Sequence, residues 1–216
     1  MDNQTFKKVS KVAWIIIFLG FAVLVGFRID YFNKLDATNA QIEKIHATKL
    51  TLADVMGDNL PPDPGTLADA TIAGVDANQN GIRDDVELAI FETSKDSTYL
   101  RAAKLQKALS MQLILFSNFP NLDLYHEARA FADDSSGCIG QYYAPLHVEA
   151  SIKNDEEQYL KLREAEEETI DFIYNLVLNT DARKEKYHTI PSKDLKLELF
   201  KKRDHSICRY LDDNFK

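Results

Sequence analysis

An uncharged apolar run near the start of the chain limits what its first thirty residues can form. Val12 to Phe27 reads VAWIIIFLGFAVLVGF, sixteen residues without a charge, with three lysines before it and Arg28 after it. As a helix this run is about 24 Å long, and the flanking basic side chains can extend to the lipid headgroups. We therefore predict that residues 1–28 form a cytoplasmic tip and a transmembrane signal-anchor.

A cleaved signal peptide is the alternative, since it has the same basic start and apolar middle. Such a peptide ends in small residues at the last and third-last positions before the cut. Gly26 preceded by Leu24 is a poor pair, and no cysteine follows that could be lipidated. By the positive-inside rule, the lysine-rich end of an uncleaved anchor lies in the cytoplasm. This predicts a single-pass protein of a bacterial inner membrane with an extracytoplasmic, periplasmic C-terminal domain.

The charge balance of the remaining chain restricts its partners. Residues 1–28 hold four of the 26 basic and one of the 34 acidic residues, so the remainder has a net charge of −11. A surface this acidic repels phosphate backbones and anionic lipid headgroups. We expect no nucleic-acid binding, and we expect divalent cations or a basic protein partner instead.

The two cysteines, Cys138 and Cys208, both fall in the part predicted to be exported. In an oxidising compartment we expect a Cys138–Cys208 disulfide, which closes about 70 residues and contributes about 4 kcal/mol. Two buried free thiols are the alternative. Neither cysteine lies in a CxxC motif, so nothing here indicates a zinc or thioredoxin-type site.

The segment NLPPDPG, Asn59 to Gly65, marks the boundary between a linker and a folded body. Its three prolines and its glycine prevent both a regular hydrogen-bond ladder and helical backbone angles. We therefore predict a stalk or linker over residues 29–65 and an extracytoplasmic helical domain over residues 66–216.

Apolar residues in this body recur at steps of three and four, and no useful stretch alternates with the period of a strand. The fold class is therefore predicted to be all-α. The expected helices cover Ser97–Phe116, Asp155–Leu178 and Thr180–His188, with a last one after Ser192. Asn121 is expected to cap a further helix that ends near Gly137, and Pro145 is expected to interrupt the chain again.

The segment DANQNGIRDDVE, Asp76 to Glu87, has an oxygen-bearing side chain at every second position, then a glycine, then a glutamate. It matches D-x-[DN]-x-[DN]-G-x5-E without a miss. Calcium needs six to eight oxygens from a tightly curved loop, and Gly81 can take the positive φ that the bend requires. The predicted ligands are the side chains of Asp76, Asn78, Asn80, Asp84 and Glu87 and the main-chain carbonyl of Ile82.

These twelve residues resemble the loop of the EF-hand family, and more closely the single loops of dockerin and thrombospondin type 3 repeats. The resemblance implies a Ca²⁺ ion as the cofactor and covers only residues 76–87 with the start of the next helix. Paired EF-hands carry a large apolar residue at the eighth position, for contact with a sister loop, whereas this chain has Arg83 there and no second loop. With three carboxylates, the expected dissociation constant is about 10⁻⁴ to 10⁻³ M.

A metal-free reading of the same segment is an Asn80-Gly81 turn followed by a helix capped by Asp84 or Asp85. Elsewhere the five histidines are scattered, and no metalloprotease, nucleophile-elbow or phosphate-loop motif occurs. We therefore expect a non-enzymatic protein-interaction module with a structural calcium ion. The alternatives are an envelope inhibitor or immunity-type protein that blocks a basic toxin or hydrolase, and an enzyme without a recognisable motif.

Overall fold

The computed structural model divides the chain into two compact units, Met1–Glu43 and Lys44–Lys216. The residues that the structure describes are 14, 18–21, 23–26, 28–29, 50–116 and 122–189, without the side chains of 122–124 and 127. In the first unit all described residues are helical. Among the described residues no helix is long and apolar enough to span a membrane. Much of the predicted anchor, and the helix expected after Ser192, lie outside the described residues.

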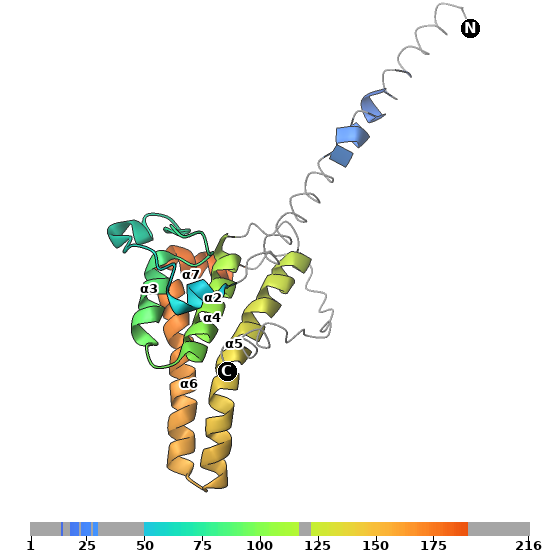
Figure 1. Cartoon of the computed structure of the whole chain (residues 1–216). Helices are drawn as coiled ribbons and strands as arrows, with labels where there is room; N and C mark the ends of the chain where they lie inside the picture. The colour runs from blue at the N-terminus through green and yellow to red at the C-terminus, as the bar shows by residue number, and fades with distance from the viewer. Residues whose placement is uncertain are drawn as a thin grey trace, which may run out of the picture. The chain divides into compact units, whose positions relative to one another are not determined.

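The second unit is built from helices, and its described residues contain no strand, so the predicted all-α class is confirmed. In chain order its elements are α2 (Leu52–Met56), the 3₁₀ helix η1 (Gly65–Asp69), α3 (Asp84–Thr93), α4 (Thr98–Phe116), α5 (Leu122–Ile152), α6 (Glu156–Val177) and α7 (Asp181–His188). Figure 1 shows α5 and α6 running side by side as a long hairpin, with α3 and α2 near α4.

The central element is α4, which contacts α2, α3, α5, α6 and α7. Every residue from Ala102 to Leu115 is buried, including five polar ones, whereas the apolar spacing predicts a single buried face. Two of these polar groups bond to α5: Lys107 Nζ donates to the carbonyl of Ala132 at 2.9 Å, and Ser110 Oγ lies 2.8 Å from Ser135 Oγ. Because α4 contacts helices on several sides, more of its residues are buried than the apolar spacing predicts.

Helix α5 is continuous, so the predicted end near Gly137 and the predicted interruption at Pro145 are both wrong. Pro145 is exposed within the helix, and its missing N–H removes one main-chain hydrogen bond. On either side of it, Tyr143 and Ala150 are buried. Tyr143 Oη lies 3.0 Å from Thr169 Oγ1 of α6. Packing along α4 and α6 thus offsets the local cost of the proline.

The starts of the last two described helices agree with the sequence. Asp155 caps α6, with its carboxylate accepting from the main-chain N of Gln158 at 2.9 Å. Thr180 caps α7, with its hydroxyl accepting from the main-chain N of Arg183 at 3.3 Å. Side-chain oxygens satisfy helix N–H groups that have no partner within the helix. The predicted helices over 155–178 and 180–188 are therefore confirmed.

Helix α2 lies inside segment 29–65, which is predicted to be a stalk or linker. Thr51 and Asp54 form a capping box, in which each side chain accepts from the main-chain N of the other residue, at 2.8 and 3.3 Å. The helix ends at Gly57, whose φ of 87° suits glycine. Val55 is fully buried, and α2 contacts α4. This short helix therefore packs on the body.

Candidate metal site

The segment between η1 and α3 is closed into a loop by its own main chain. The N–H of Asp84 donates to the carbonyl of Val75 at 2.9 Å, which brings the two ends of the loop together. Gly81 has a φ of 85°, so the positive φ predicted for it is confirmed, and Gln79 is also left-handed at 59°. The loop therefore has the tight curvature that a sequence of alternating ligands requires.

Asp76 sits inside this curve. One of its oxygens accepts from the N–H of Asn80 at 3.2 Å, and the other accepts from the N–H of Gly81 at 3.0 Å. Asn80 Oδ1 in turn accepts from the N–H of Ile82 at 2.8 Å. Burial raises the pKa of Asp76, with hydrogen bonds from the loop opposing the shift. The side-chain oxygens at the first and fifth positions of the pattern thus both accept hydrogen bonds from main-chain N–H groups of residues 80–82.

Asp84 and Glu87 both lie in the first turn of α3, and neither is exposed to solvent. Asp84 Oδ1 accepts from the N–H of Ala77 at 2.9 Å, and Glu87 Oε2 accepts from Asn78 Nδ2 at 3.0 Å. The second oxygen of each carboxylate, Asp84 Oδ2 and Glu87 Oε1, is buried without a hydrogen-bond partner among the residues that the structure describes. Desolvation raises the pKa of Glu87 to about 7; the amides of Asn78 and Asn80 oppose the shift, and the charges of Asp54 and Asp84 add to it.

The metal-free reading of the segment predicts that Asp84 or Asp85 caps α3, and the structure shows neither arrangement. The N-cap is Arg83, whose side chain makes no capping bond. Asp84 reaches back across the loop to Ala77, whereas Asp85 pairs with the Arg83 guanidinium at 2.6 Å. Neither carboxylate therefore caps the start of α3.

The remaining predicted ligands also belong to this loop. Ile82, predicted to contribute its carbonyl oxygen, buries its side chain completely. Asn78 Nδ2 donates to the carbonyl of Asn59 at 2.8 Å as well as to Glu87. Asn80 Nδ2 is buried and has no partner within hydrogen-bonding distance in the described part of the chain, although the Asn80 amide lowers the pKa of Glu87. The loop is thus tied to the proline-rich segment before it.

Within the described residues, no three His, Cys, Asp or Glu side chains gather closely enough to hold a metal ion by themselves. The predicted set has three carboxylates, Asp76, Asp84 and Glu87, and takes its other oxygens from amides and a main-chain carbonyl. Such mixed sets suit calcium, which accepts neutral oxygens and flexible geometry. Buried carboxylate oxygens without partners fit this donor chemistry, because a cation satisfies what no N–H reaches.

The structure also places an acidic residue near the site that the motif does not include. Asp54 of α2 is almost fully buried, and its charge is among the causes that raise the pKa of Glu87. The signal for its local structure is in the sequence, because Thr51-Leu-Ala-Asp54 matches the capping-box pattern. Nothing in the pattern indicates that α2 packs close to α3.

The predicted disulfide lies only partly within the described residues. Cys138 is fully buried on α5, and its predicted partner Cys208 lies outside the described residues, so the disulfide stays a prediction. His147 Nε2 lies 3.1 Å from a carboxylate oxygen of Glu166, and His188 Nε2 lies 2.6 Å from the hydroxyl of Tyr174.

Comparison with protein-family models, curated proteins and solved structures gave no match to this chain.

Proposed function

We propose that residues 76–87 bind one calcium ion that holds the entry to α3 in place. The domain that carries this loop is anchored to the membrane by residues 1–28, lies outside the cytoplasm, and is a non-enzymatic module that binds another protein. The observation that carries the calcium part is the pair of unpaired, buried carboxylate oxygens on Asp84 and Glu87.

Burying an ionised oxygen without a partner is costly, because the protein must replace the water that it removes. Asp84 and Glu87 stand one turn apart at the start of α3, and the charge of Asp84 makes ionising Glu87 more costly. The helix dipole favours them there, although the dipole effect is limited to about 1 kcal/mol. A divalent cation supplies the missing partner for both side chains at once.

The role of the cation is structural, because the loop is continuous with the apolar core. Ile82 within the loop, and Val86 and Ile90 on the following helix, have no exposed surface. The loop therefore sets both the start of α3 and the depth at which its apolar face enters the core. Because the ion binds only the folded loop, it stabilises the domain by mass action.

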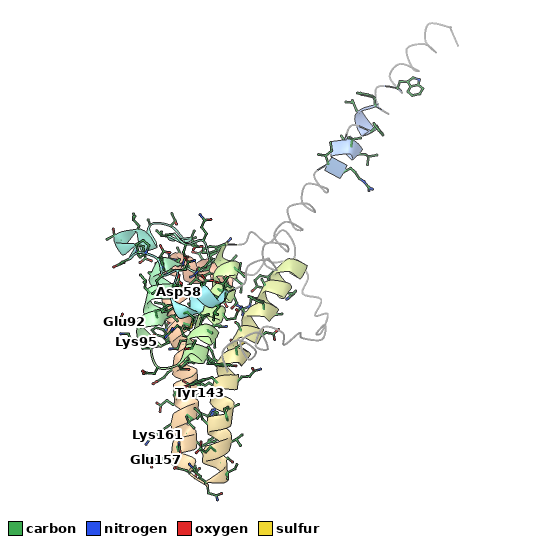
Figure 2. All side chains as sticks on the ribbon, viewed as in Figure 1. Asp58, Glu92, Lys95, Tyr143, Glu157 and Lys161 are labelled. Carbon is green, nitrogen blue, oxygen red and sulfur yellow. The ribbon has the colours of Figure 1, made fainter. Side chains whose placement is uncertain are left out.

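The hairpin of α5 and α6 supports the proposed role in protein binding. Residues 141–168 carry eight acidic and three basic residues. Val148, Ile152 and Leu160 are more than half exposed among these charges. Figure 2 shows Glu157 and Lys161 near the end of this hairpin, where they form an exposed ion pair at 2.6 Å. A partner with a basic, partly apolar surface suits this arm.

The calcium proposal is tested on the purified full-length chain by thermal melting and titration calorimetry. Glu87→Gln keeps the size of the side chain and removes one ligand charge, whereas Glu157→Gln makes the same change at an exposed position on α6. At fifty times the dissociation constant, calcium stabilises a one-site protein by about 2 kcal/mol, which is roughly 5 °C in melting temperature for this size.

We expect this rise in the unmodified chain and in Glu157→Gln, and little or none in Glu87→Gln. If calcium produces neither heat nor a melting shift in the unmodified chain, the proposed site is wrong. An equal rise in Glu87→Gln would place the cation elsewhere in the molecule.

A further inference from the structure

Two arginines without exposed surface, Arg83 and Arg183, connect the candidate loop to the far end of the chain. Arg83 is the eighth residue of the loop, between the predicted ligands Ile82 and Asp84. Arg183 lies in the first turn of α7. Both reach the residues between Leu176 and Arg183, which we call the α6–α7 junction.

The main chain and the side chain of Arg83 both bond to residues outside the loop. Its N–H donates to Gln112 Oε1 of α4 at 2.7 Å. Its guanidinium donates to the carbonyls of Val177 at 3.1 Å and Leu176 at 3.3 Å, which are the last carbonyls of α6. A cation at these carbonyls also complements the negative end of the helix dipole.

Arg183 makes the reverse connection, from α7 back to the chain that enters the loop. Its guanidinium donates to the carbonyls of Ala68 at 2.6 Å, Thr71 at 2.9 Å and Ile72 at 3.0 Å, and it pairs with the carboxylate of Asp69. Hydrogen bonding to Asn179 and Arg183 lowers the pKa of Asp69, so its carboxylate stays ionised.

Asn179 joins the two arginines at the junction. Its Oδ1 accepts from Arg183 at 2.5 Å and lies 3.4 Å from the Arg83 guanidinium, while its Nδ2 donates to Asp69 at 3.0 Å. The entry to the loop and its eighth residue are thus held by one small polar network that contributes none of the predicted ligands.

We propose that the α6–α7 junction takes the place of the sister loop of a paired EF-hand, so that calcium binding at residues 76–87 and ordering of the junction reinforce each other. This inference rests on the proposed function. Ile82 and Asp84 cannot move to accept a cation without moving the arginine between them, and that arginine is fixed to α6. Coupling of this kind is reciprocal. Ordering of the junction therefore raises calcium affinity by the same factor as bound calcium raises the equilibrium constant for that ordering.

The test is hydrogen exchange and calcium titration of the full-length chain. Calcium is expected to slow exchange of the main-chain amides between residues 176 and 183 by roughly tenfold. Arg83→Lys keeps the charge but loses the planar set of donors, so it should abolish this slowing and weaken calcium binding roughly tenfold. Arg163→Lys is the matched control, because Arg163 is exposed on α6 and pairs across one turn with Glu167 at 3.3 Å.

Asn179→Ala separates coupling from a local effect on the loop, since it changes a junction residue and leaves the sequence of residues 76–87 unchanged. It should also weaken calcium binding several-fold, and it supplies the measurement if Arg83→Lys does not fold. If calcium binds with full heat while exchange at the junction is unchanged, or if Asn179→Ala binds calcium as the unmodified chain does, the coupling is overturned and the calcium site stands. If the unmodified chain binds no calcium, both proposals fall.

Discussion

At the scale of single residues, Asn78 decides how the loop balances its charges. Its Nδ2 donates to the carbonyl of Asn59 and to the buried carboxylate of Glu87. The position next to Glu87 is thus held by a neutral amide. Asn78→Asp replaces that donor by a fourth carboxylate, in addition to Asp76, Asp84 and Glu87. Without calcium we expect a lower melting temperature, because like charges then face each other; with calcium we expect roughly tenfold tighter binding, because ligand charge sets affinity in such loops.

The control for this prediction is Gln79→Glu, which adds the same charge to the same loop at an exposed position between two predicted ligands. Calorimetry in parallel on both variants separates coordination from the general field of the loop. If Gln79→Glu tightens calcium binding as much as Asn78→Asp does, then Asn78 is not a ligand.

At the scale of elements, the turn that enters the loop depends on one glycine. Gly74 has a φ of 67°, and a Cβ at this position would lie 2.6 Å from Arg83 Cδ and 2.9 Å from the carbonyl oxygen of Ala68. Gly74→Ala is therefore expected to destabilise the domain by about 2 kcal/mol or more, through backbone strain and displacement of the buried arginine.

The contrasting variant is Gly137→Ala in α5. Gly137 is exposed, and no described atom lies within 4 Å of the position of its Cβ. Alanine there should stabilise the helix by about 0.5 to 1 kcal/mol. Chemical denaturation of both variants measures the two changes, and equal effects would contradict the distinct role of the loop glycine.

At the scale of the whole molecule, stability should depend on pH through Glu87. Its pKa is about 7 in the folded chain against 4.5 as a reference, so the folded state binds the proton more tightly. This contribution is complete below pH 4.5 and is lost as the pH rises through 7. In the presence of a chelator, we therefore expect the unmodified chain to melt at a higher temperature at pH 6 than at pH 8.

Glu87→Gln should lose most of this difference between pH 6 and pH 8, since glutamine does not titrate. Calcium should reduce the difference in the unmodified chain, because a cation favours the ionised carboxylate. Melting curves at the two pH values, with chelator and with calcium, measure both effects. If the melting temperature of Glu87→Gln differs between the two pH values as much as that of the unmodified chain does, the pH dependence comes from another group.

The parts of the fold that depend on local spacing could be predicted from the sequence. Helices α6 and α7, the positive φ of Gly81 and the start of α3 near Asp84 all follow from periodicity, capping residues and turn chemistry. The continuity of α5 through Pro145 could not be predicted, because contacts with two other helices outweigh a local signal.

The surroundings of the candidate site depend on distant parts of the chain, and this is why the sequence did not indicate them. Arg83 appears in the pattern only as a departure from the eighth position of paired loops, yet it is a buried link to α6. Lysine is mostly exposed in folded proteins, whereas Lys107 is buried here and burial lowers its pKa to about 8. Only tertiary packing determines these two environments.

The long separation between the loop and its anchors has a consequence for the order of folding. Arg83 bonds to a carbonyl 94 residues later, and Arg183 bonds to a carbonyl 111 residues earlier. Contacts this far apart form late, since the entropy of closing the intervening chain must be met first. A chain growing from its N-terminus therefore exposes the acidic loop well before α7 exists to secure it, and the twelve residues take their final arrangement only near the end of synthesis.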